Sequence, residues 1–173
     1  MEISILALPL IASIISGFFG KFIGDRNSEI VTSLLVSISA ILSAIVFYEV
    51  IFNQYEENII IATWINSGSL EVNWSMKIDA LSSVMLVVVT FVSALVHIYS
   101  IGYMSHDPHK PRFMAYLSLF TFAMLMLVTP DNFVQLFFGW EGVGLCSYLL
   151  IGFWYKKASA NNAAMKAFIV NRV

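Results

Sequence analysis

Four ionisable side chains in otherwise apolar stretches are the candidates for chemistry, and Glu141 is the first of them. It is the only formal charge between Asn132 and Tyr155, and at ~1.5 Å per helical residue it lies ~14 Å from Asn132, near the middle of a ~30 Å hydrocarbon layer. A charged side chain there is unfavourable by roughly 2.5 to 3.5 kcal/mol, so it marks an ion or proton path by default. The alternative is a protonated, purely structural Glu141. A neutral Gln would fill that role equally well, which favours the functional interpretation.

The other three candidates are His97, Lys166 and Arg172. His97 lies ~10 Å from the cytoplasmic end of its apolar stretch; it is a candidate proton relay, although an imidazole bonded to a neighbouring carbonyl is commonplace there. Lys166, also ~10 Å deep, is a candidate relay within snorkelling range of the interface. Arg172 lies deeper and needs a carboxylate or a water-filled cavity, which makes it a candidate partner in a charge pair. Interface anchoring is the alternative for both cations, and it fits Lys166 better.

Small residues surround Glu141 and allow close helix approach or water, at Gly139, Gly142, Gly144, Cys146 and Ser147. Tyr148 lies on nearly the same helix face as Glu141 and offers a hydroxyl group toward the cytoplasmic side. A hydrated path past Glu141 is therefore chemically feasible.

The composition indicates an integral membrane protein: 59% of the 173 residues are hydrophobic, 12% are charged and the mean hydropathy is +0.83. The single Cys146 excludes a disulfide framework within the chain. With nine basic and 11 acidic residues, the chain has no excess of positive charge with which to bind nucleic acid. Nucleotide-binding glycine motifs are absent, and His97, His106 and His109 lack metal-site spacing. We expect no cofactor and no metal in this chain.

Apolar runs predict an all-α polytopic membrane protein with five complete transmembrane helices, at about residues 3–23, 30–52, 79–104, 112–130 and 131–155. A sixth run, at 159–173, covers only ~22 Å, so we expect the sequence to be cut within that helix. Residues of about 58–78 alternate in polarity around the turn sequence Asn66-Ser67-Gly68-Ser69 and predict a short β-hairpin on the outer side. Its apolar face is expected to cap helix ends or contact a neighbouring subunit, with interfacial anchoring by Trp64 and Trp74 as the alternative.

Loop charges orient the predicted spans. Six basic residues fall on one side: Lys21, Arg26, Lys110, Arg112, Lys156 and Lys157. The other side carries Lys77 against Glu49, Glu56, Glu57, Glu71, Asp79 and Asp131. The positive-inside rule therefore predicts an outer N-terminus and a Lys156 loop in the cytoplasm or matrix.

Four segments carry a resemblance to a known family: FGWEGVGLCSYLLIGFW at 138–154, HIYSIGYM at 97–104, WSMKIDALSSVM at 74–85 and AAMKAFIVNRV at 163–173. In this order they resemble the subunit L family of NADH-quinone oxidoreductase, respiratory complex I, whose mitochondrial counterpart is NADH dehydrogenase subunit 5. The resemblance extends over nearly the whole chain. It implies that residues 1–173 are the N-terminal portion of one antiporter-like transmembrane domain, a helix bundle.

The resemblance implies a proton-translocating subunit of a respiratory-chain enzyme that couples electron transport to ubiquinone with proton transport. In the family, the glutamate matching Glu141 pairs with a lysine on a later helix, and the motif at Arg172 continues with Gly-Asp; both lie beyond residue 173. NADH, flavin, iron–sulfur clusters and quinone are expected in partner subunits. Expected partners are the other membrane and peripheral subunits of complex I and the lipid bilayer, with no nucleic acid.

Two other functions remain open. One is a subunit of a multisubunit cation/proton antiporter, and the other is a membrane anchor that transports nothing. We rank complex I first, the antiporter second and the anchor last. For location, we favour the bacterial inner membrane over the mitochondrial inner membrane.

Overall fold

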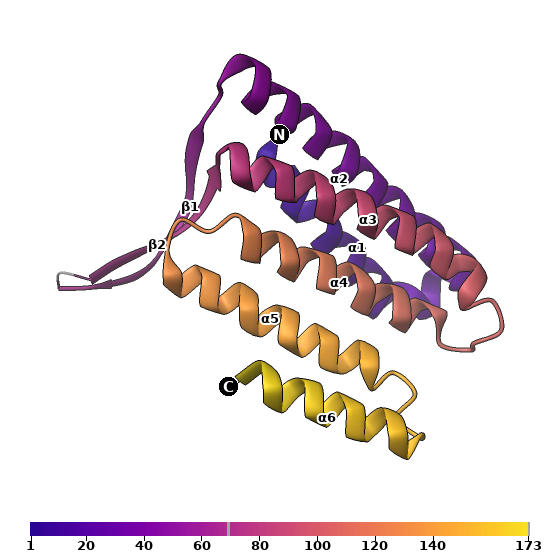
Figure 1. Cartoon of the computed structure of the whole chain (residues 1–173). Helices are drawn as coiled ribbons and strands as arrows, with labels where there is room; N and C mark the ends of the chain where they lie inside the picture. The colour runs from indigo at the N-terminus through magenta and orange to yellow at the C-terminus, as the bar shows by residue number, and fades with distance from the viewer. Residues whose placement is uncertain (69, 173) are drawn as a thin grey trace.

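The computed structural model describes residues 1–68 and 70–172. These residues form helices and one hairpin in the order α1 (Glu2–Ile23), α2 (Asp25–Asn53), β1 (Glu57–Ser67), β2 (Leu70–Ile78), α3 (Ala80–Tyr103), α4 (Lys110–Val128), α5 (Phe133–Ile151) and α6 (Ala158–Arg172). Successive helices run in opposite directions along a common axis, and the hairpin projects from one end (Figure 1). We call this the hairpin end, and the opposite end, which carries Lys110, Lys156 and Lys157, the basic end.

Helices α1 to α5 are each long and apolar enough to cross a membrane. The predicted fold class, an all-α multi-pass membrane protein with a small antiparallel hairpin, is confirmed. α6 has 15 residues. Two helix ends differ from the expected ranges. α2 begins at Asp25 rather than near residue 30, because Gly24 adopts φ 87° and reverses the chain directly after α1. α5 ends at Ile151, and turns follow to Lys156.

Helices α1 to α4 pack together as one group, α5 packs on α4, and α6 packs on α5 (Figure 1).

A proline in α1 determines a hydrogen bond between α1 and α2. Pro9 lies inside α1 and has no N–H to donate to the carbonyl of Ile5. The hydroxyl group of Ser39 on α2 donates to that carbonyl instead, at 2.7 Å. The backbone acceptor freed by Pro9 is therefore satisfied by the neighbouring helix.

The interior of the bundle differs between its two ends. Near the hairpin it is an apolar cluster, which we call the outer cluster, made of Ile5, Leu6, Val46, Val50, Met76, Ile78, Leu86, Leu125 and Met126. Away from this cluster many buried side chains carry hydroxyl groups, with Ser28, Ser43, Thr90 and Ser118 each fully shielded from solvent. Polar side chains are therefore buried in the bundle beside the apolar cluster.

The hairpin is docked on the bundle through β2. β1 and β2 pair from Glu57 opposite Ile78 to Ser67 opposite Leu70, and Gly68 supplies the positive φ of 62° that the turn needs. Gln135 of α5 holds β2 with both ends of its amide, accepting from Ser75 N at 3.0 Å and donating to Ser75 O at 2.7 Å. The hairpin therefore caps the α4–α5 end of the bundle.

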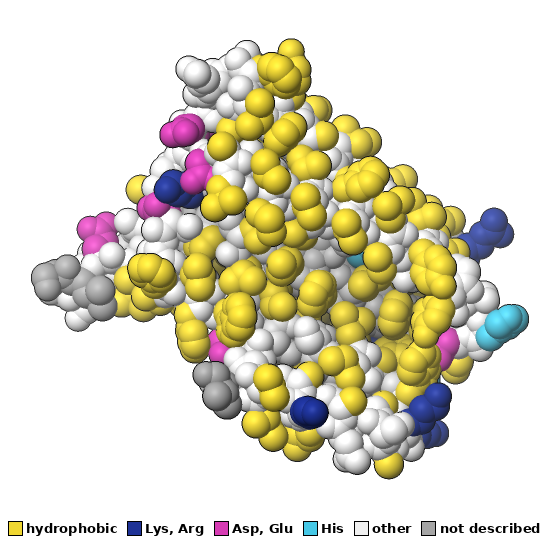
Figure 2. Space-filling view, in the orientation of Figure 1, with side chains coloured by type: hydrophobic (Ala, Val, Ile, Leu, Met, Phe, Trp, Pro, Cys, Tyr) yellow, Lys and Arg dark blue, Asp and Glu magenta, His cyan; other side chains and the backbone are white. Residues whose placement is uncertain are grey.

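The surface is consistent with a membrane environment. Figure 2 shows hydrophobic side chains covering the face between the two ends, with acidic side chains gathered near the hairpin and Lys and Arg side chains mostly toward the opposite end. This distribution matches the charge asymmetry on which the predicted orientation depends.

Candidate functional site

Glu141 lies in the middle of α5, and its carboxylate forms an ion pair with the guanidinium group of Arg172 on α6. The Glu141 side chain is 20% exposed and the Arg172 side chain 42%. The Arg172 guanidinium also stacks on the ring of Phe168, 4.5 Å from its centroid. Two of the four predicted site residues are thus in contact, through a carboxylate of α5 and a guanidinium group of α6.

Two glycines of α5 allow the neighbouring helices to approach closely. A Cβ atom on Gly139 would lie 2.7 Å from the Cα atom of Leu127 on α4. A Cβ atom on Gly144 would overlap the side-chain amide of Asn171 on α6. The indole N–H of Trp140 donates to the backbone carbonyl of Asn171 at 3.1 Å. The small residues around Glu141 therefore position α4 and α6 on either side of the carboxylate.

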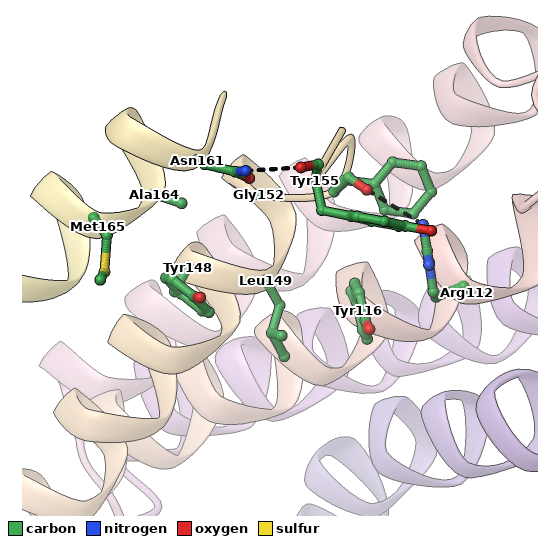
Figure 3. A pocket seen from close by; sticks show the side chains of 10 residues that line it. Arg112, Tyr116, Tyr148, Leu149, Gly152, Tyr155, Asn161, Ala164 and Met165 are labelled. Carbon is green, nitrogen blue, oxygen red and sulfur yellow. Dashed lines mark hydrogen bonds between the residues drawn. The ribbon is translucent and has the colours of Figure 1, made fainter. Parts of the chain in front are cut away.

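A pocket of about 390 Å³ opens at the basic end between α4, α5 and α6 (Figure 3). Tyr116 and Tyr148 line it with hydroxyl-bearing rings. Arg112 and Met165 lie at opposite sides of the pocket. The Arg112 guanidinium donates to Phe153 O at 3.2 Å and stacks 4.6 Å from the centroid of the Phe153 ring. Tyr148 contacts the ring of Phe168, which lies under Arg172. An edge-to-face pair of aromatic rings, Tyr148 and Phe168, therefore connects the lining of the pocket with Arg172.

The remaining predicted site residues lie apart from Glu141. Lys166 is exposed on α6 and makes no ion pair with any described residue. His97 is fully buried in α3, where its ring nitrogens contact Ser93 O at 2.8 Å and Ser118 Oγ at 3.0 Å. The structure therefore brings Glu141 and Arg172 together and keeps Lys166 and His97 separate from them.

Sequence reasoning did not single out Glu29. It is 5% exposed in α2, because that helix starts earlier than expected and carries the carboxyl group into the bundle. Its neighbours Asp25 and Arg26 made the segment resemble a charged loop. Gly24 just before them was the available signal for an earlier helix start.

Within the described residues, no group of His, Cys, Asp and Glu side chains is arranged to hold a metal ion.

Two family profiles match the chain. One, described as NADH-ubiquinone oxidoreductase (complex I), chain 5 N-terminus, matches residues 64–114, and the other, NADH:quinone oxidoreductase/Mrp antiporter, TM, matches residues 130–173. NADH-ubiquinone oxidoreductase chain 5 of Arabidopsis thaliana is 57% identical over the entire chain, and NADH-quinone oxidoreductase subunit L of Rickettsia bellii is 54% identical over the same length. The chain belongs to the chain 5/subunit L family.

The chain spans about a quarter of the length of these chain 5/subunit L relatives, 26% of the plant protein and 27% of the bacterial one. A solved structure with the same fold is that of the membrane-bound sulfane sulfur reductase, an archaeal respiratory membrane complex. One of its chains aligns with a TM-score of 0.79 and 18% identity, over 98% of this chain and 34% of that one. The antiparallel bundle with its docked hairpin is therefore shared with a respiratory membrane complex.

Proposed function

We propose that this chain is part of a proton-translocating membrane subunit of NADH:quinone oxidoreductase, in which Glu141 is a protonatable group on the translocation path. The observation that carries the proposal is the Glu141–Arg172 ion pair at mid-helix, in a chain whose relatives are chain 5 and subunit L of that enzyme. A charge pair inside an apolar span is unfavourable unless its two members offset each other, and such residues mark ion paths.

The proposed mechanism is electrostatic. In a low dielectric, a nearby guanidinium group stabilises the Glu141 carboxylate, whereas separation of the pair favours the neutral, protonated carboxyl group. A movement of α6 relative to α5 would therefore bind or release a proton at Glu141. Arg172 keeps its own charge throughout, because a guanidinium group does not lose its proton in proteins. The lysine that the family resemblance implies would add a second, titratable cation to the same axis.

The route by which protons reach Glu141 is proposed to pass the pocket at the basic end. Tyr148 lies about two turns after Glu141 on nearly the same face of α5 and lines that pocket. Its ring contacts that of Phe168 edge to face, and the Arg172 guanidinium group lies over Phe168. Rotation of these two rings would open or close contact with water. Lys166, exposed near the middle of α6, is proposed as an auxiliary relay.

The proposed subunit has no redox centre of its own in this chain. NADH, flavin, iron–sulfur clusters and quinone are proposed to lie in partner subunits of the complex, and quinone reduction there supplies the work. Each proton moved against the membrane potential requires ~2.3 kcal/mol per 100 mV. The bacterial inner membrane is the proposed location, and the mitochondrial inner membrane is the alternative, since both plant and bacterial relatives match at similar identity.

The test uses the full-length subunit in its native complex, assayed in membrane vesicles. Glu141→Gln keeps the size of the side chain and removes its titration, so we expect proton translocation to fall by roughly tenfold or more, while Glu141→Asp retains part of it. Lys166→Gln is the matched control for a charged side chain outside the ion pair, and it should cause a smaller loss. An unchanged proton-to-electron ratio in Glu141→Gln, with normal assembly on native gels, would contradict the proposal.

A second candidate function is a subunit of a multisubunit cation/proton antiporter. The profile that matches residues 130–173 is described for both NADH:quinone oxidoreductase and the Mrp antiporter. Sodium-dependent proton exchange in vesicles without any quinone reductase would favour this second function. Proton uptake that requires NADH and quinone would favour the first.

A further inference from the structure

A row of buried polar side chains runs through α2, α3 and α4, separate from the Glu141 site. Its members are almost fully shielded from solvent: Glu29 5%, Ser33 7%, Ser43 0%, Thr90 0%, His97 0%, Ser100 3%, Ser118 0% and Thr121 1% exposed. From Glu29 to Ser43 the row extends ~21 Å along α2. Burying this many hydroxyl groups, an imidazole and a carboxyl group is unfavourable unless they are hydrogen-bonded or hydrated.

Hydrogen bonds between helices connect much of the row. The hydroxyl groups of Ser43 and Thr90 are 2.6 Å apart, and those of Ser93 and Thr121 are 2.5 Å apart. One turn further toward the basic end, His97 Nε2 lies 3.0 Å from Ser118 Oγ. Because α2 and α3 are antiparallel and meet at Ser43 and Thr90, Ser33 and Ser100 lie at the same depth, about 15 Å nearer the basic end.

The two ring nitrogens of His97 have different partners, and the Ser93 hydroxyl group also lies 3.3 Å from Nδ1. Nδ1 lies 2.8 Å from the backbone carbonyl of Ser93, which can only accept, so Nδ1 carries a hydrogen. Nε2 faces the hydroxyl group of Ser118. In the neutral ring Nε2 accepts from Ser118, and in the imidazolium form Nε2–H donates to it. A proton is therefore gained or lost at Nε2 without any rotation of the ring.

The end of the row near the basic end contains polar atoms without protein partners. Neither Glu29 Oε1 nor Ser33 Oγ has a hydrogen-bond partner among the described residues, although both atoms are shielded from solvent. They lie one turn apart on α2. Buried polar atoms of this kind are usually hydrogen-bonded to ordered water. Water at Glu29 and Ser33 would connect the row to the aqueous phase.

The other end of the row is closed. Beyond Ser43 and Thr90, α2 and α3 continue into the outer cluster, where Val46 and Leu86 are fully buried. Leu125 of α4 lies in the same cluster, past Thr121. The polar row thus ends at the unpartnered atoms of Glu29 and Ser33 toward the basic end and at apolar side chains toward the hairpin end.

We propose that this row is a second proton site of the subunit, in which Glu29 collects protons at the basic end and His97 Nε2 holds one inside the bundle. A proton that enters past Glu29 and Ser33 binds Nε2 to give an imidazolium, and its departure restores the neutral ring. The inference rests on the proposed function in proton translocation, but it assigns a site that shares no residue with the Glu141–Arg172 pair. The row lies inside the four-helix group of α1 to α4.

The first experiment measures water access. In a Cys146→Ser background, single cysteines at Ser33 and Ser100 are exposed to Ag⁺ in vesicles of either orientation, with Val46→Cys in the outer cluster as the control. We expect Ser33→Cys and Ser100→Cys to react from the basic end roughly tenfold or more faster than Val46→Cys. Equal rates at the three positions, or faster reaction from the hairpin end, would overturn the proposed path.

The second experiment measures proton translocation by the full-length subunit in its complex. Glu29→Gln, His97→Gln and Ser118→Ala should lower the proton-to-electron ratio, whereas Ser37→Ala should not, since the Ser37 hydroxyl group bonds only to Ser33 O in its own helix. A normal ratio in an assembled His97→Gln complex would sink the inference. If His97→Gln had a normal ratio while Glu141→Gln still stopped translocation, the proposed function would stand and only the second proton site would be rejected. If His97→Gln fails to assemble, the Ag⁺ rates at Ser33 and Ser100 decide.

Discussion

Asp79 illustrates how a single side chain fixes the start of a membrane helix. Its carboxylate accepts from Ser82 N at 2.8 Å, and the Ser82 hydroxyl group accepts in turn from Asp79 N at 2.8 Å, which together form a capping box on α3. The hydrogen bond from the Ser82 backbone is the main cause that holds the pKa of Asp79 below its ordinary value, and partial burial opposes it.

Asp79→Ala should lower the free energy of unfolding by about 0.5 to 2 kcal/mol at neutral pH, because the cap is lost. Since the folded-state pKa lies below the unfolded value, the contribution of the carboxylate is present above pH 3.8 and is lost as pH falls through the lowered pKa. Thermal unfolding in detergent at several pH values measures this. The difference between wild type and variant should shrink in acid, and a difference that grows would refute the assignment.

Residue types alone predicted Glu141 as a site, because an isolated carboxyl group in an apolar run is visible without any structure. The partner of Arg172 was not predictable in the same way. From its depth in an apolar run, Arg172 was expected to need a carboxylate or a water-filled cavity, without any indication of which helix supplies it; the ion pair joins it to Glu141 of α5. Which helix faces lie together depends on close approach at Gly144, and that is a property of packing rather than of local sequence.

At the scale of elements, α5 is the helix on which the site depends, because it contacts α4 on one side and α6 on the other. Length and apolar composition predicted the helices and polarity alternation predicted the hairpin. The contact of the hairpin with Gln135 was not predictable, since it pairs a side-chain amide with the backbone of Ser75, 60 positions away in sequence.

Gly139→Ala should destabilise the α4–α5 contact by about 1 to 3 kcal/mol, because the new methyl group would meet the backbone of Leu127, which cannot move aside as a side chain can. Gly102→Ala is the matched control, since a Cβ atom there has nothing within 4 Å. Unfolding in mixed micelles with increasing denaturing detergent measures both variants. Equal stability of the two would show that α4 and α5 are not closely packed at Gly139.

At the scale of the whole molecule, the charge pattern predicts which end faces which compartment. The acidic hairpin end is expected outside and the basic end in the cytoplasm or matrix. In a Cys146→Ser background, an impermeant thiol reagent should label Ser105→Cys and Ser159→Cys from the inner side only, and Ser67→Cys from the outer side only. All three positions are exposed at the ends of the bundle. Labelling of any of them from the opposite side would reverse or break the proposed topology.

The contact between Ser39 and the carbonyl of Ile5 has a consequence for motion. A carbonyl group left without a donor inside a bilayer is unfavourable by several kcal/mol, and Pro9 ensures that α1 itself cannot supply that donor. Sliding α2 along α1 by one turn would carry Ser39 out of reach. The two helices are therefore held in one register and cannot slide along each other. A movement of α6 relative to α5 at Glu141 would therefore leave α1 and α2 fixed relative to each other.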